Sequence, residues 1–422
     1  MSLRIGIVAP PAIGHLNPML ALALELTRRG HAVVVFTVAD GARKLAGLPL
    51  QLVTIGAECF PAGSVDATYA QLGRLSGLAG LRFTVRYFRQ EQAMLHEQLP
   101  EVLRAAKLQL LLVDQLSPAA ATVAERLGLP YVTIANALPV NREAAVPPYF
   151  SGWQPSPAPW ARWRNQLGNA LLDRLTASLW SDLQEQRQRW GLPVRRRREQ
   201  LHSPLLQLAQ LPRAFDFARE RLAPQFHYVG PLADPSGREP LLRDAVPFPW
   251  ERLDGRPLIY ASLGTLQNGR PELFAAIASA CAPLEAQLVI SLGRPGAPLP
   301  ALPGEPLVVA FAPHQQLIAR SALVITHAGL NTTLTALACG VPLLAIPITN
   351  EQPGIAARIA HCGAGRALPV RQLTSQRLRA MVAEMLGDDR YRQAARRLQA
   401  EIAAAGGVAR AAELIEACLA NA

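Results

Sequence analysis

The feature that most constrains this chain is the alternation of short, β-branched apolar runs with longer helical segments. In the first half, strands are predicted at Ile5–Val8, Val33–Val38, Leu110–Val113 and Tyr131–Ile134, with helices such as Pro18–Arg29 and Pro118–Leu127 between them. In the second half, the predicted strands are Leu258–Ser262, Leu288–Leu292, Leu307–Phe311, Leu323–Thr326 and Leu343–Ile346. This alternation is typical of parallel sheets with helices on both faces. The sequence therefore predicts an α/β protein with two doubly wound domains.

A segment rich in proline, glycine and charge, residues 232–257, separates the two series of strands and is predicted to be a linker. It leaves two Rossmann-like domains, residues 1–231 and 258–390, each of ordinary size. Residues 391–422 have helical spacing broken at Gly406-Gly407 and are predicted to be closing helices. When two such domains face each other, the carboxyl ends of both sheets border one cleft. The functional residues are expected in this interdomain cleft.

Charge and cysteine content indicate the kind of partner and the cellular compartment but do not identify the function. The net charge of +11 favours anionic partners such as phosphorylated substrates, lipid headgroups or nucleic acid, without choosing among them. The five cysteines are odd in number and lack paired spacing, which favours a reduced cytoplasm. No apolar run reaches the length of a membrane span, and no basic-then-apolar segment opens the chain. We expect a cytoplasmic protein that is soluble or peripheral at a membrane.

The run Trp190–Arg198 follows four other tryptophans, Trp153, Trp160, Trp163 and Trp180. Tryptophan beside arginine is typical of side chains at a membrane interface, where anionic headgroups attract the arginines. A solvated basic face with packed tryptophans would explain the same pattern. Both interpretations remain open, and one of them predicts peripheral membrane contact.

The stretch between residues 311 and 367 carries the most specific chemistry. A strand is predicted to end at Thr326, followed by the turn His327-Ala328-Gly329, and Asn331 and Thr332 open a helix that runs to about Cys339. A helix N-terminus offers free amides and positive potential to phosphate, and these two side chains add donors. The pattern predicts a diphosphate site that needs no metal ion. An ordinary capped helix is the alternative.

A second motif lies at the start of the chain, where His15 follows the first predicted strand. Asn17 and Pro18 are predicted to cap and open the next helix, so His15 should lie at the carboxyl end of the strand and face the cleft. An imidazole with a pKa near about 6.5 is suited to remove a proton from a hydroxyl. Asp114 follows another strand of the same sheet and is predicted to orient it as a His-Asp dyad. A purely structural histidine is the alternative.

In order and spacing, these motifs resemble the family 1 glycosyltransferases, which have the GT-B fold. The resemblance covers most of the chain and points within that family to the zeaxanthin (carotenoid) glucosyltransferases, at HAGLNT, IPITNEQPGIAARI and AGGVARAAELIE. It implies two facing Rossmann-like domains and an inverting, UDP-dependent hexosyltransferase with glucose as the expected sugar. The implied acceptor is a hydroxyl of an apolar molecule such as a carotenoid, sterol, terpenoid or phenol. No cofactor, metal ion or nucleic acid is expected.

The resemblance also implies roles for individual residues. Phe311 and His314 would line the uracil pocket, His327, Asn331 and Thr332 would hold the diphosphate, and Glu351 and Gln352 would bind sugar hydroxyls. A carboxylate accepts from two hydroxyls and an amide both donates and accepts, so the last pair could distinguish hexoses. Gly264, in the turn that includes Thr265, would allow close approach to the phosphates, with Thr265 donating its hydroxyl.

This chain departs from the family pattern at three of these places. Phe311 stands where many relatives have tryptophan, and His314 where they have glutamine. Thr335 stands where the family usually has the carboxylate that binds the ribose hydroxyls. A single hydroxyl is a poorer partner for a diol, so the sequence leaves UDP and TDP donors both open.

The acceptor is expected among loops of the first domain, lined by apolar and aromatic side chains: Phe60, Tyr69, Leu72, Leu78, Phe83, Tyr149, Phe150 and Trp153. The motifs GxGxxG, GxxxxGK[ST], HExxH and DxD are absent from the sequence. Two alternatives to a glycosyltransferase remain open at this point. One is a nucleotide-sugar epimerase on a similar scaffold, and the other is a non-catalytic basic protein that binds membranes or nucleic acid.

Overall fold

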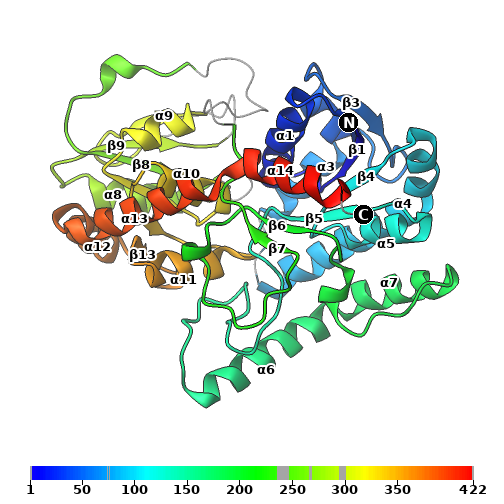
Figure 1. The fold of residues 1–422 in the computed structure, drawn as a ribbon. Helices are drawn as coiled ribbons and strands as arrows, with labels where there is room; N and C mark the ends of the chain where they lie inside the picture. The colour runs from blue at the N-terminus through cyan, green and yellow to red at the C-terminus, as the bar shows by residue number, and fades with distance from the viewer. Residues whose placement is uncertain are drawn as a thin grey trace.

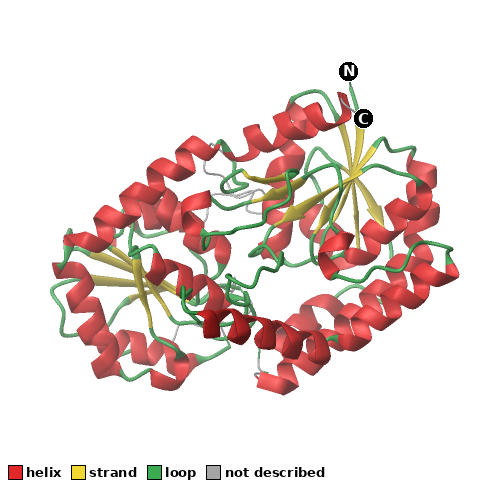
Figure 2. Cartoon of the chain, turned by 60° about the horizontal axis from the view of Figure 1, so that its bottom comes forward, coloured by secondary structure: helices red, strands yellow, loops and turns green. Residues whose placement is uncertain are grey.

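The computed structural model describes residues 2–73, 75, 77–234, 247–265, 269–293 and 301–420. They form two α/β domains side by side, each built around a parallel sheet (Figure 1). The first sheet has seven strands in the order β3-β2-β1-β4-β5-β6-β7, and the second has six in the order β10-β9-β8-β11-β12-β13. Helices cover both faces of each sheet (Figure 2). The predicted pair of doubly wound domains is confirmed.

The first sheet consists of β1 (Arg4–Val8), β2 (Ala32–Thr37), β3 (Gln51–Thr54), β4 (Leu110–Asp114), β5 (Tyr131–Ala135), β6 (Gln207–Ala209) and β7 (Phe226–Tyr228). Its helices are α1 (Ile13–Arg28), α2 (Ala39–Leu45), α3 (Ser64–Leu72), α4 (Gly77–Ala106), α5 (Pro118–Leu127), α6 (Pro159–Leu175) and α7 (Ala177–Arg189). Strands that are covered on both faces consist of continuous apolar runs, and all five residues of β4 are buried. This burial is why the central strands could be predicted from the sequence.

The second sheet consists of β8 (Leu258–Ser262), β9 (Gln287–Ser291), β10 (Leu307–Val309), β11 (Leu323–Thr326), β12 (Leu343–Ala345) and β13 (Gly365–Ala367). Its helices are α8 (Pro271–Cys281), α9 (His314–Ala319), α10 (Leu330–Ala338), α11 (Gln352–His361) and α12 (Ser375–Gly387). Short 3-10 helices occur at Arg198–Leu201, Arg213–Phe215, Trp250–Arg252 and Val370–Gln372. Residues 235–246 of the predicted linker lie outside the described residues.

Two C-terminal helices span both domains. They are α13 (Asp389–Ala405) and α14 (Gly407–Ala420), separated at Gly406, whose φ of +85° is readily adopted only by glycine. In Figure 1, α13 lies over the second domain and α14 beside α1 of the first. The Glu416 carboxylate accepts from Arg29 at 3.1 Å and contacts the His31 ring at 3.0 Å. The chain thus returns to the first domain after completing the second.

The predicted start of the first helix is wrong, because α1 begins at Ile13 and contains Pro18 in its interior. Asn17 is therefore not its cap. A proline inside a helix cannot donate to the carbonyl four residues earlier, which here is that of Gly14. The Gly14 carbonyl instead accepts a hydrogen bond of 3.1 Å from the Asn331 side chain of the second domain. The proline therefore leaves a backbone acceptor free for a contact between the domains.

Candidate active site

A cavity of about 660 Å³ lies between the two domains, within the usual size range of small-molecule sites. Every site residue predicted from the sequence lines it: His15, Asp114, Thr265, Phe311, His314, His327, Gly329, Asn331, Thr332, Thr335, Glu351 and Gln352. The first domain and the second domain thus supply opposite walls of one cavity. The roles assigned to these residues stay predictions.

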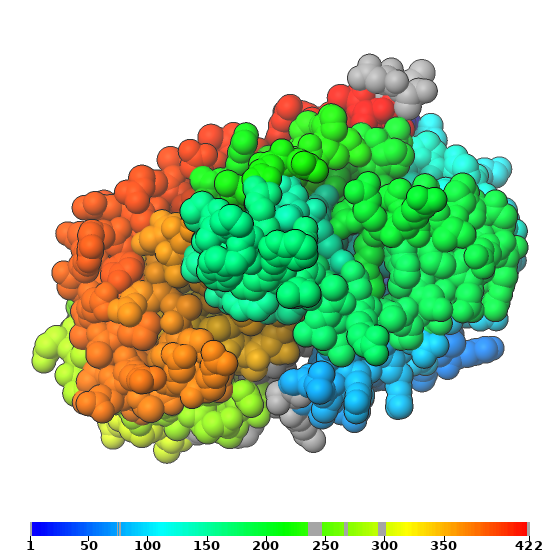
Figure 3. Space-filling view, turned by 90° about the horizontal axis from the view of Figure 1, so that it is seen from below, coloured from blue at the N-terminus to red at the C-terminus, as the bar shows by residue number. Residues whose placement is uncertain are grey.

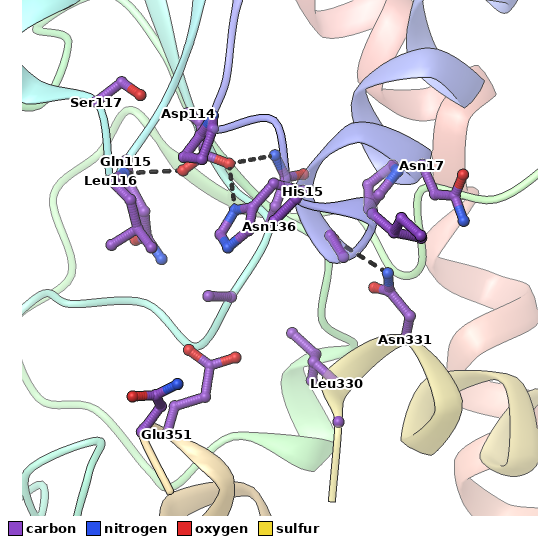
Figure 4. A pocket seen from close by; sticks show the side chains of 18 of the residues that line it. His15, Asn17, Asp114, Gln115, Leu116, Ser117, Asn136, Leu330, Asn331 and Glu351 are labelled. Atoms are coloured by element: carbon purple, nitrogen blue, oxygen red, sulfur yellow. Dashed lines mark hydrogen bonds and ion pairs between the residues drawn. The ribbon is translucent and has the colours of Figure 1, made fainter. Parts of the chain in front are cut away.

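The predicted dyad forms where β1 and β4 end side by side. His15 lies in the first turn of α1, the helix that follows β1, and Asp114 is the last residue of β4. The His15 Nδ1 and Asp114 Oδ2 atoms are 2.7 Å apart (Figure 4). The Asp114 side chain is fully buried, whereas that of His15 is 19% exposed. Because Asp114 engages Nδ1, Nε2 is the nitrogen left for a ligand.

Two residues that sequence reasoning missed complete this arrangement. Asn136 donates to Asp114 Oδ2 at 2.7 Å, and the Leu116 amide donates to Oδ1 at 2.8 Å. Gln210 donates to the backbone carbonyl of Asn136 and, at 3.1 Å, to the side-chain oxygen of Asn331. Asn136 directly follows β5 and Gln210 directly follows β6, the next two strands of the sheet. A polar residue after each buried strand was the signal that could have found them.

The electrostatics of the cavity favour a charged His15. Burial alone would lower the pKa of His15, but the charge and hydrogen bond of Asp114, with the charges of Glu351 and Glu91, raise it to about 9. Burial raises the pKa of Glu351 to about 7 and that of Glu91 to about 8. In the ligand-free protein, the imidazole therefore carries a proton at neutral pH.

This protonation predicts how activity depends on pH. Only the neutral imidazole can accept a proton, so kcat/KM should rise with pH until the pKa of free His15, about 9, is passed. The Glu91→Gln substitution should move the midpoint to lower pH, because the Glu91 charge raises the pKa of His15. Initial rates at subsaturating substrate, from about pH 6 to pH 10, would measure both profiles. Flat profiles across this range would contradict the assignment of His15 as the base.

On the opposite wall, the His327 ring packs between two glycines. A Cβ atom on Gly264 or on Gly329 would lie 2.6 Å from this ring. Gly264, which is predicted to let the backbone approach phosphates, lines the cavity and makes room for the imidazole. Burial lowers the pKa of His327 to about 4, and a hydrogen bond to the backbone of Ser262 opposes this shift. His327 is therefore neutral at neutral pH. A neutral imidazole has one N–H, so His327 could donate to an anion only by giving up its bond to the Ser262 backbone.

Helix α10 matches the predicted phosphate-binding helix, since it starts at Leu330 and has Cys339 as its C-cap. Asn331 lies in its first turn, where its side chain contacts Gly14 and Gln210 of the first domain. These contacts use its amide oxygen and one of its two N–H groups, which leaves the second N–H to donate to a diphosphate. The Thr335 hydroxyl donates to the Asn331 carbonyl at 2.9 Å, within the helix.

Glu351 and Gln352 stand at the start of α11. Figure 4 shows the Glu351 side chain pointing toward the space below His15 and Asn136. The amide oxygen of Gln352 accepts from the backbone of Ile348 at 2.8 Å and Thr349 at 2.9 Å. Gln352 therefore keeps only its donor group for a sugar, in contrast to the predicted two-way hydrogen bonding.

His314 also has a partner within the protein, because its Nδ1 is 3.2 Å from the Tyr260 hydroxyl. Burial, and to a lesser extent the charge of His327, lowers the pKa of His314 to about 4. It is a neutral ring on the cavity wall beside Phe311. That His314 lies beside the base of a bound nucleotide stays a prediction.

The acceptor side differs from the prediction in two ways. Of the eight proposed lining residues, five line the cavity: Tyr69, Leu72, Phe83, Tyr149 and Phe150. Phe60 instead lies in the core at 3% exposure, Leu78 is 60% exposed on the surface, and Trp153 lies under Arg164. In addition, Tyr69, Leu72 and Phe83 belong to the helices α3 and α4, not to loops. The helical spacing of this region was not recognised in the sequence.

Comparison with known proteins identifies the family. A family model for the erythromycin biosynthesis protein CIII-like C-terminal domain matches residues 275–419. The zeaxanthin glucosyltransferase of Pseudescherichia vulneris is 37% identical over 422 residues, covering 99% of this chain and 98% of that protein. The chain belongs to the family 1 glycosyltransferases. The zeaxanthin glucosyltransferase of Pantoea ananas is 32% identical over 417 residues, covering 97% of this chain and 94% of that protein.

The architecture is that of the GT-B glycosyltransferases. The crystal structure of the glycosyltransferase VinC in complex with dTDP superimposes with a TM-score of 0.70 at 21% identity, with all of both chains covered. Membership of a glycosyltransferase family disfavours both alternatives raised by the sequence, the epimerase and the non-catalytic basic protein. For a glycosyltransferase, one cavity must receive a donor and an acceptor, and here the two domains provide its two walls.

Proposed function

We propose that this glycosyltransferase transfers a hexose, with glucose expected, from UDP-sugar to a hydroxyl group of an apolar acceptor, with inversion at the anomeric carbon. The observation that carries the proposal is the His15–Asp114 pair, which lies between the aromatic lining of the first domain and the polar wall of the second. The relatives named for zeaxanthin support a hydroxylated carotenoid as acceptor. Sterols, terpenoids and phenols belong to the same chemical class of acceptor.

The proposed reaction is a single displacement. Neutral His15 removes the proton of the acceptor hydroxyl through Nε2, and Asp114 stabilises the imidazolium that forms. The acceptor oxygen forms a bond to the anomeric carbon while the bond from that carbon to the diphosphate oxygen breaks. The leaving diphosphate keeps the electron pair. Because the attacking oxygen and the leaving group lie on opposite sides of the sugar carbon, the configuration inverts.

The charge of the leaving diphosphate would be met by the start of α10 and by no metal ion. The first amides of this helix have no partner within the helix, and its dipole adds positive potential. Asn331 and Thr332 lie in its first turn and can donate from their side chains. Asn331 would donate through the N–H that neither Gly14 nor Gln210 uses, so it could bind the donor while it keeps its contacts with the first domain.

Thr335 offers a test of donor choice. Its hydroxyl donates to the Asn331 carbonyl at 2.9 Å, so this single oxygen can only accept from a ribose hydroxyl. The Thr335→Glu variant should bind UDP about tenfold more tightly, because a carboxylate can accept from both ribose hydroxyls. Binding of dTDP, whose sugar lacks the 2′-hydroxyl, should gain much less. Calorimetric titration of both nucleotides would measure the difference, and equal gains would contradict a ribose contact at this position.

The reaction itself can be tested with UDP-glucose, a chelator and a panel of hydroxylated carotenoids, sterols and phenols. The expected result is UDP release together with products that gain one hexose of inverted configuration. Consumption of dTDP-glucose in place of UDP-glucose would correct the donor. UDP release that needs no added alcohol would contradict an acceptor-dependent transfer.

We place this reaction in the cytoplasm, with peripheral contact at a membrane. All five cysteines are free thiols, which supports a reducing compartment: Cys59, Cys281, Cys339, Cys362 and Cys418. Fractionation of cells that express the protein would test this location. Recovery outside the cytoplasm and its membrane fraction would contradict it.

A further inference from the structure

Helix α6 presents an apolar face on the outside of the molecule. Its large side chains Trp160, Trp163, Leu167, Leu171 and Leu175 are 60%, 70%, 68%, 56% and 40% exposed. Spacings of three and four residues align them along one side of the helix. The buried positions of α6 are instead Ala161, Asn165 and Gly168. This helix therefore reverses the usual amphipathic arrangement, in which the apolar side faces the core.

The exposed face lies directly outside the cavity. Figure 1 shows α6 along the lower edge of the molecule, and Figure 3 views that side, with residues of this region in teal and green at its centre. The inner side of α6 contributes Leu172 to the cavity wall, and α7 contributes Leu179, Trp180 and Leu183. One layer of helix therefore separates the exposed apolar face from the chamber proposed for the acceptor.

Arginines surround this face. Between residues 153 and 198 the sequence has nine arginines and three carboxylates. At the start of α6, the Arg164 guanidinium lies 4.8 Å from the ring centre of Trp153 and 5.2 Å from that of Trp160. At its end, Arg198 bonds to Asp173 at 2.8 Å, which places the basic run beside the helix. The face is therefore apolar along its centre and basic at both ends.

Part of this positive charge is available to a partner. The side chains of Arg174, Arg196 and Arg197 are exposed and form no ion pair with any residue in the described part of the chain. A second copy of the protein would bring two arginine-rich faces together and is disfavoured by repulsion. An anionic lipid surface instead offers phosphates to the arginines and acyl chains to the tryptophans and leucines.

We propose that α6 docks in the plane of an anionic lipid surface, with its tryptophans and leucines below the headgroups. The helix would lie on the bilayer, since no described helix combines the length and apolar composition needed to cross one. Arg174, Arg196 and Arg197 would contact lipid phosphates. The use of this contact rests on the proposed function: an apolar acceptor could pass from the bilayer to the chamber behind α6.

Flotation with lipid vesicles tests the docking directly. The full-length protein should float with vesicles of phosphatidylcholine mixed with phosphatidylglycerol, and much less with phosphatidylcholine alone. The Trp163→Gln, Leu167→Gln double variant should bind the mixed vesicles at least about tenfold more weakly, because two large apolar side chains no longer insert. The Gln166→Ala variant changes an exposed polar residue of the same helix and should bind as the wild type does.

A second measurement separates docking from function. Transfer to a water-soluble phenol should be unchanged in the double variant, whereas transfer to a hydroxylated carotenoid held in mixed vesicles should fall with binding. If no acceptor is glycosylated but binding and its loss are observed, the proposed function fails and the docking stands. Binding that is absent from both vesicles, or unchanged in the double variant, overturns the docking. A dimer that the same substitutions dissociate, without vesicle binding, also overturns it.

Discussion

The His15→Ala variant is expected to lose about 10²–10⁴-fold in kcat, the contribution usual for a positioned general base. UDP affinity should change little, because the residues assigned to the nucleotide lie on the wall of the second domain. The fold should tolerate the change, since Asp114 keeps its hydrogen bonds from Asn136 and the Leu116 amide. Initial rates of UDP release, with a parallel titration of UDP, would measure both effects.

A matched control is His227→Ala, because His227 lies on β7 and does not line the cavity. This variant should keep a rate close to that of the wild type. If the His15 variant retained more than about a tenth of the wild-type rate, another group would have to remove the acceptor proton. A large loss of UDP affinity in the same variant would place His15 in the donor site instead.

The Asp114→Asn variant is expected to lose about 10³-fold in kcat, because a neutral amide no longer stabilises the imidazolium or fixes its tautomer. The variant should also show a shifted pH profile, which a general loss of structure would not produce. The Asp114 charge and hydrogen bond are the main causes that raise the pKa of His15 to about 9, so the midpoint of the pH profile should move to lower pH. Rates measured across the pH range would show both effects.

The control for this prediction is Asn136→Ala, which removes one hydrogen bond to Asp114 but keeps the carboxylate. It should lose about tenfold or less and leave the pH midpoint near that of the wild type. An Asp114→Asn enzyme with an unchanged midpoint would show that Asp114 does not set the protonation of His15. If Asn136→Ala lost as much in kcat as Asp114→Asn does, the Asn136 side chain would do more than position Asp114.

The central strands could be predicted because a strand that is buried on both faces consists of a continuous run of apolar residues. Leu258–Ser262 and Leu323–Thr326 coincide with β8 and β11, and the other predicted strands differ from the observed ones by one or two residues at their ends. The short strands β3, β6, β7 and β13 were not predicted. Helices were harder to predict. The long α4 was not predicted, because its buried positions include Glu91, Gln92 and His96, which interrupt its apolar periodicity. As a result, Phe83 of α4 was assigned to a loop, as were Tyr69 and Leu72 of the short α3, which was not predicted either.

Some residues of the candidate site could also be predicted from their positions relative to the strands. A polar residue at the end of a buried parallel strand, or at the start of the helix that follows it, lies near the carboxyl edge of the sheet, and this rule places His15 and Asp114 near each other. The same rule applies to Asn136 and Gln210, but the short β6 gave too weak a signal to be recognised as a strand. The reach of Asn331 to the Gly14 carbonyl could not be predicted, since it depends on how the two domains face each other.

By itself, the sequence determined the two parallel sheets, the chemical types of the site residues and the family, because these depend on short-range patterns of burial and on residue order. The tertiary structure alone decided that His15 carries a proton at neutral pH, since His15 and three carboxyl groups, from two helices, a strand and the turn before α11, meet in one buried space. It also decided that Pro18 frees a carbonyl for Asn331 and that α6 turns its apolar side outward. These properties arise from groups far apart in the chain, and their energies depend on distance and on exclusion of water, which residue order does not specify.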